Sequence, residues 1–148
     1  MVHYLTVQDV LWINTEITKK VCSFKYLQLE EAVNYQYGYG KSVDVLGQAG
    51  QFLQGFLRLR PFETGNRATA FISALTFLKI NGFDIDLDPH SAKDWVMAVA
   101  ERKKTGIEAV KEIARPTGKP LELKPAIRTE VKELLEKYSE AVSEITDD

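Results

Sequence analysis

The residues with the clearest chemical potential form a short polar loop before the most apolar stretch of the chain. The loop spans residues 61–66 (PFETGN), and Arg60 and Arg67 flank it. A glycine-containing loop at the start of a helix offers unpaired main-chain N–H groups and the positive end of the helix dipole, and both favour a bound anion. Two alternatives follow from the pattern: a phosphate-binding loop, or a helix start with a purely structural role.

The stretch that must position this loop is apolar on nearly every side from residue 68 to residue 80. A helix without a polar face belongs in the middle of a domain. Asn81 and Gly82 are typical of a helix end, since glycine tolerates the left-handed conformation that follows the last turn. The sequence therefore predicts an all-α fold, with six or seven helices around a central buried helix.

The other helices are predicted from their starts and their apolar stripes. We expect the first helix to end near Lys20 and the helix after residue 105 to end near Arg115. Residues 83–89 alternate apolar and acidic side chains, which predicts an extended segment. A Ser or Thr that can cap a helix precedes four of the stripes: Thr6, Ser42, Ser91 and Thr105.

The C-terminal part of the chain is set apart by composition. Residues 115–120 (RPTGKP) are typical of a linker, and they divide the chain into a helical domain, 1–116, and a C-terminal segment, 117–148. A narrow apolar stripe from Ile127 to Ile145 predicts a last amphipathic helix that must dock on something. It can pack on its own domain, on a second copy as a homodimer, or on a partner, and we expect docking on itself or on a second copy.

A known signature is visible in the central region. The residues that match it are Pro61, Phe62, Gly65, Asn66, Thr69, Asn81 and Gly82. The stretch resembles the signature of the Fic/Doc family (filamentation-induced-by-cAMP and death-on-curing proteins), which reads His-x-Phe-x-(Asp/Glu)-(Gly/Ala)-Asn-(Gly/Lys)-Arg-Thr. Residues 4–10 and 29–33 are similar to the death-on-curing branch, so the likeness spans about 3–115. The resemblance implies a helical bundle, with or without a short β-hairpin flap, that transfers AMP or phosphate from ATP with Mg²⁺ to a protein.

Three positions depart from that signature. Arg60 stands at the catalytic histidine, Thr64 stands at the metal-holding acid with Glu63 beside it, and Ala68 stands at the second basic position with Arg67 before it. Arginine keeps its proton at any working pH and cannot act as a base. We therefore expect a degenerate Fic/Doc-like protein without transferase activity, in a toxin–antitoxin or regulatory setting. Its predicted nucleotide- or phosphate-binding residues are Arg60, Thr64, Gly65, Asn66 and Arg67.

Two alternative functions stay open. An active transferase with rearranged roles would need Glu63 as its base. A protein-interaction module would act through the C-terminal helix. The resemblance also implies a flap at Phe24, Lys25 and Tyr26 that docks a protein target or an antitoxin, although the same segment would serve equally well as a plain connector.

Composition narrows the class of protein. The chain is 45% hydrophobic and 27% charged, which is typical of a soluble globular domain. Its net charge of -2 gives no global basic field, so we expect neither nucleic acid nor a membrane as partner. Cys22 is the only cysteine, and no cysteine or histidine pair has metal-ligand spacing. We expect a cytoplasmic protein with no signal peptide and no bound metal.

Overall fold

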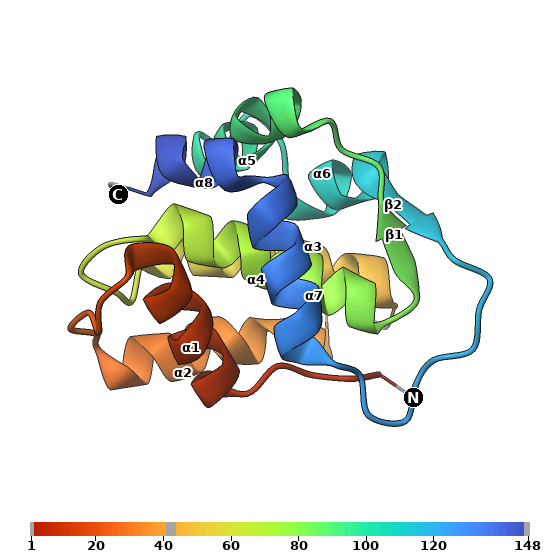
Figure 1. Cartoon of the computed structure of the whole chain (residues 1–148), viewed down its shortest axis with the longest axis horizontal. Helices are drawn as coiled ribbons and strands as arrows, with labels where there is room; N and C mark the ends of the chain where they lie inside the picture. Colours follow the sequence, from red (N-terminus) through yellow and green to blue (C-terminus); the bar gives the residue numbers. More distant parts are fainter. Residues whose placement is uncertain (1, 41–43, 147–148) are drawn as a thin grey trace.

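The computed structural model describes residues 2–40 and 44–146, and these residues form a helical bundle with one very small sheet (Figure 1). The predicted all-α class is confirmed. The α-helices of the described part are α1 (Val7–Thr18), α2 (Tyr26–Asn34), α3 (Val45–Leu59), α4 (Asn66–Ile80), α5 (Ala92–Ala100), α6 (Gly106–Ile113), α7 (Ile127–Lys137) and α8 (Ser139–Ile145). The 3₁₀ helices are η1 (Tyr35–Gly40) and η2 (Pro89–Ser91), and the strands are β1 (Phe83–Ile85) and β2 (Ala114–Pro116).

Helix α4 is the core of the bundle, and every residue in it except Arg67 and Lys79 is buried. It packs against α1, α3 and α7, and Figure 1 shows α7 crossing over it. It begins after Gly65, which has φ 79°, and it is followed by Gly82, which has φ 92°. Both values lie in the left-handed region that glycine adopts most easily. The predicted central helix and both of its ends are therefore confirmed.

The helix starts follow the sequence pattern in two of the four predicted places. Thr6 and Thr105 each form a complete capping box at the start of α1 and α6. Ser42 lies outside the described residues, and Asp44 caps α3 by accepting a hydrogen bond of 2.7 Å from an N–H of the first turn. Ser91 precedes α5, but its side chain makes no capping hydrogen bond.

Two helices end earlier than predicted. Helix α1 ends at Thr18, because Lys19 adopts a left-handed conformation with φ 63°. Helix α6 ends at Ile113, because the next three residues form β2 and pair with β1. The pairing is antiparallel and joins Phe83 to Pro116 and Ile85 to Ala114. The predicted extended segment is thus a strand over its first three residues.

The predicted C-terminal helix is broken into α7 and α8, so the described chain has more helices than the predicted six or seven. Tyr138 lies at the break, and its buried hydroxyl donates a hydrogen bond of 2.8 Å to the carbonyl of Leu87. The apolar stripe packs on the chain's own helices, since α7 contacts α4 and α8 contacts α5. Residues 2–116 and 117–146 therefore share one hydrophobic core, to which the stripe contributes Val131, Leu134, Tyr138, Val142 and Ile145.

Candidate anion-binding site

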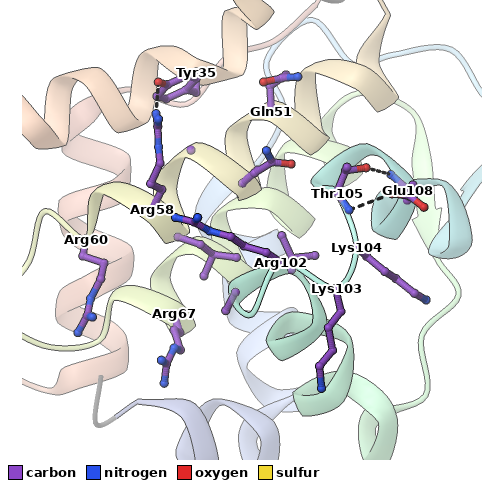
Figure 2. Close-up of a pocket in the computed structure, with 15 residues that line it drawn as sticks. Tyr35, Gln51, Arg58, Arg60, Arg67, Arg102, Lys103, Lys104, Thr105 and Glu108 are labelled. Atoms are coloured by element: carbon purple, nitrogen blue, oxygen red, sulfur yellow. Dashed lines mark hydrogen bonds between the residues drawn. The ribbon is translucent and has the colours of Figure 1, made fainter.

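A groove of about 790 Å³ lies beside the start of α4 (Figure 2). Its walls come from α3, the first residues of α4, the end of α5, and the segment 101–105 that leads into α6. Six basic side chains line it: Arg58, Arg60, Arg67, Arg102, Lys103 and Lys104. Glu108 is the one acidic residue among the described lining residues.

The charge of this groove is opposite to that of the chain as a whole. The sequence holds 19 basic and 21 acidic residues, and six of the basic residues but only one of the acidic residues line the groove. The rest of the chain is therefore clearly acidic. Like charges gathered in a groove focus the electric field and raise the local concentration of oppositely charged ligands. The groove is thus suited to an anion.

Arg58 is fixed to the α3 wall by Tyr35. A Cβ on Gly55 would lie 2.5 Å from the Tyr35 ring, so the glycine allows that ring to pack directly on α3. The Arg58 guanidinium donates a hydrogen bond to the Tyr35 hydroxyl, and it lies 5.4 Å from the centre of the ring. A cation above an aromatic face is attracted to it. The tyrosine therefore orients Arg58 at the groove.

Arg60 and Arg67 reach the groove from the two ends of the predicted loop. Arg60 follows the last residue of α3 and has φ 48° and ψ 63°, in the left-handed region. Arg67 is the second residue of α4. Figure 2 shows both side chains at the same end of the groove. The two arginines of the predicted site therefore line one surface.

The 101–105 wall is held against α3 by two glycines. A Cβ on Gly106 would lie 2.0 Å from the carbonyl oxygen of Gly50, so the two backbones are in direct contact. The Gly106 N–H also donates a hydrogen bond of 2.8 Å to the Gln54 side chain. These contacts fix the start of α6, and with it they fix the position of Arg102 relative to α3.

The other residues of the predicted site hold the loop in place and do not line the groove. The Asn66 side chain is buried and forms two hydrogen bonds with the main chain of Phe62, of 2.8 and 2.7 Å. The Thr64 carbonyl accepts a hydrogen bond of 3.1 Å from Asn14, a residue of α1. A Cβ on Gly65 would lie 2.7 Å from a methyl group of Thr18. The tip of the loop therefore packs against α1.

The groove offers little for proton transfer. Glu63 is exposed, does not line the groove, and donates its main-chain N–H to Ser23 at 2.9 Å. His3 and His90, the two histidines of the sequence, lie in other parts of the structure. Hydrogen bonding with Thr105, above all from its main-chain N–H, lowers the pKa of the Glu108 carboxyl and makes it a weaker base.

The predicted flap lies against the outer side of the loop. Phe24 forms an isolated antiparallel bridge with Phe62, and the Lys25 N–H donates to the Pro61 carbonyl at 3.0 Å. No hairpin forms at this place within the described residues. Apolar side chains are unusually exposed on this segment: Val21 at 85%, Phe24 at 38%, Tyr26 at 55% and Leu27 at 77%.

Four basic residues of the groove were missed by sequence reasoning. Arg58 was not recognised as a site residue, because the helix that contains it was identified by its apolar face and not by its charged side chains. Arg102, Lys103 and Lys104 form a run of three positive charges directly before the capping threonine of α6. That run was a usable signal, but nothing local in the sequence places it beside Arg60 and Arg67.

Two further properties hold for residues 2–40 and 44–146. No helix there combines the length and the apolar character needed to cross a bilayer. No group of three or more histidine, cysteine, aspartate or glutamate side chains in the same ranges could hold a metal ion.

Comparison with known proteins assigns no function to the groove. The chain matches no family model, no curated protein and no solved structure.

Proposed function

We propose that this chain is a phosphate- or nucleotide-binding protein of Fic/Doc-like ancestry that lacks AMP- and phosphotransferase activity. One observation carries the proposal: Arg60 and Arg67, the two arginines beside the predicted loop, line the same groove as four further basic side chains. In a toxin–antitoxin or regulatory setting, such a protein would bind its ligand without transferring any part of it.

The chemistry of arginine supports an anionic ligand with several oxygens. A guanidinium group presents N–H donors in a planar fork that matches two phosphate oxygens at once. Arg60 keeps its positive charge at every working pH, so it can hold a phosphate but cannot accept a proton from a substrate hydroxyl. Binding without transfer is the function that this residue type favours.

The alternative of an active transferase has less support from the geometry. It requires a base within hydrogen-bond reach of the substrate hydroxyl, and Glu63 is the candidate. Glu63 does not line the groove that holds Arg60 and Arg67. If the alternative were correct, ATP with Mg²⁺ would be its substrate complex, and label from ATP would appear on a protein.

The experiment is a calorimetric titration of the purified chain with ATP, ADP and inorganic phosphate at low and at physiological salt. Wild type should bind, and Arg67→Ala should weaken binding about tenfold or more, as the loss of a charge-assisted hydrogen bond predicts. The matched control is Lys93→Ala, which removes one positive charge from an exposed position of α5 outside the groove. Equal curves for wild type and Arg67→Ala would remove this residue from the site.

A second candidate function is favoured by the exposed flap. We propose that residues 21–27 dock an extended segment of a protein target or antitoxin. Within the described residues, the main-chain N–H and C=O of Phe24 make no hydrogen bond, so this edge can pair with another strand. Val21→Ser with Leu27→Ser should leave the fold intact and weaken binding of the product of a neighbouring gene. Unchanged binding would exclude the flap as the docking edge.

A further inference from the structure

We propose that the groove contains a second phosphate subsite, formed by Arg58 and Arg102, beside the one proposed at Arg60 and Arg67. The ligand is then a chain of linked phosphates, inorganic or carried on a nucleoside, that spans both subsites. This inference rests on the proposed function, because it extends the same groove and names the class of ligand.

Arg58 and Arg102 reach into the groove from different walls. Figure 2 shows the Arg102 side chain extending from the 101–105 segment toward Arg58, away from Arg67. Within residues 2–40 and 44–146, neither guanidinium forms an ion pair with a carboxylate. The Arg58 guanidinium points to Tyr35 and the Arg102 guanidinium approaches the Arg58 side chain, so two positive charges border the same part of the groove. Like charges that share one groove repel, and an anion bound there replaces that repulsion with attraction. This part of the groove is therefore suited to a phosphate contacted from both walls.

The backbone at Arg102 has the left-handed conformation that ends α5. Helix α5 ends in a Schellman motif, in which the Lys103 N–H bonds to the Ala98 carbonyl at 2.8 Å and the Arg102 N–H bonds to the Val99 carbonyl at 3.1 Å. Arg102 occupies the left-handed position of this motif with φ 63°, where glycine is the usual residue. Lys19 has the same φ outside the groove, so the value of this conformation is that it makes Arg102→Gly a substitution that the backbone accepts.

Contacts within the fold hold the backbone of both arginine walls in place. Arg58 is held by the Tyr35 ring and hydroxyl, and the 101–105 wall is fixed by the contact of Gly106 with Gly50. A site that is already ordered loses less conformational entropy when it binds. The fold therefore sets the positions of the two backbones from which Arg58 and Arg102 extend.

The lining favours a short chain of linked phosphates over a nucleic-acid strand. Strands without a fixed sequence are bound by stacking their bases on aromatic side chains. Tyr35 is the one aromatic residue among the described lining residues, and its ring is already packed on Gly55 and beneath Arg58. Lys103 and Lys104 pair with Glu101 and Glu112, so the arginines on the two walls are the side chains that remain for a ligand with several phosphates. A ligand with several adjacent phosphates can contact basic side chains on both walls of the groove.

The test compares orthophosphate, tripolyphosphate and ATP by calorimetry at fixed ionic strength. Wild type should bind tripolyphosphate at least about tenfold more tightly than orthophosphate, since a second charged contact has that magnitude. Arg102→Gly should lose most of this gain and keep its orthophosphate affinity. Glycine suits the backbone at that position, so the variant should stay folded. Lys19→Gly is the matched control, because Lys19 is also left-handed, exposed and basic but does not line the groove.

Each other outcome has a definite meaning. If Arg102→Gly and Lys19→Gly bind tripolyphosphate equally well, the second subsite does not exist, even if orthophosphate still binds and the proposed function stands. If wild type binds none of the three ligands, the proposed function itself fails. If a short oligothymidylate binds more tightly than tripolyphosphate, the ligand is a phosphodiester strand and the proposal is overturned. Equal affinities for ATP and tripolyphosphate would identify the phosphate chain alone as the recognised group.

Discussion

Gly106 lies directly against the carbonyl oxygen of Gly50, at a distance that leaves no room for a side chain on either residue. This contact joins α6 to α3, and it places the basic segment 101–105 across from Arg58. The groove therefore depends on two residues that carry no functional group. A change at either glycine should affect both the stability of the fold and the binding of an anion.

Gly106→Ala is expected to destabilise the chain by about 3 kcal/mol or more, because its Cβ would meet main-chain atoms that cannot rotate away. Urea denaturation measures the free energy of unfolding. The control is Gly118→Ala, since no atom lies within 4 Å of its Cβ position and φ is 72°. That change should cost only about 1 kcal/mol, for the left-handed backbone alone. Similar losses at the two glycines would contradict the close contact.

Arg102→Gly is expected to raise the free energy of unfolding by about 0.5–1 kcal/mol. Glycine removes the strain of the left-handed backbone and also removes one positive charge from a crowded groove. Lys19→Gly should give a rise of similar size, because its φ is also 63°. A gain in stability together with a loss of tripolyphosphate binding would show that Arg102 serves the ligand at the expense of the fold. A lower stability of Arg102→Gly would remove the strain argument.

Asn66→Ala is expected to destabilise the chain by about 2–4 kcal/mol. The substitution leaves the N–H and C=O of Phe62 buried without partners, and each such group costs about 1–3 kcal/mol. Asn34→Ala is the control, since the half-buried Asn34 side chain makes no hydrogen bond within the described residues. That variant should stay within about 0.5 kcal/mol of wild type. A small effect at both positions would mean that the loop does not depend on its asparagine.

The parts of the fold that could be predicted from sequence are those with a local cause. The capping box of Thr6 is contained in four residues, and the all-apolar stretch of α4 ends at a glycine. The strand pairing of Ala114 could not be predicted in this way, because its partner Ile85 lies far earlier in the chain. The break at Tyr138 has the same kind of cause, since its hydroxyl bonds to Leu87.

The sequence could predict only those residues of the candidate site that lie close together along the chain. Arg60 and Arg67 could be predicted as a pair because they flank one loop. Arg102 could not be added to them, because the contact between Gly50 and Gly106 brings it to the groove and glycines carry no pattern that reveals a partner. The net charge of -2 also gave no sign of the groove, because it sums the basic groove and the acidic rest of the chain.

Tyr138 should make the fold less stable at alkaline pH. Burial, with smaller effects of Asp86 and Asp88, raises the pKa of its hydroxyl from 10.0 to about 12. The folded chain therefore favours the neutral phenol, which donates its hydrogen bond to the Leu87 carbonyl. The stabilising contribution is complete below pH 10, where the phenol is neutral in both states, and it is lost as the pH rises toward about 12. Urea denaturation at pH 9, 10 and 11 (roughly the window in which a phenol begins to ionise) should give falling free energies of unfolding.

The matched variant for this prediction is Tyr138→Phe, which keeps the ring and removes the ionisable group. At neutral pH it should lose about 1 kcal/mol, the usual net value of one hydrogen bond. Its free energy of unfolding should then fall less steeply than that of wild type above pH 10, because one titrating group is absent. The ring itself still fills the core against Phe71, at 5.4 Å between ring centres, so the fold is retained. Parallel pH profiles for the two proteins would show that another group, and not Tyr138, controls the alkaline limit of the fold.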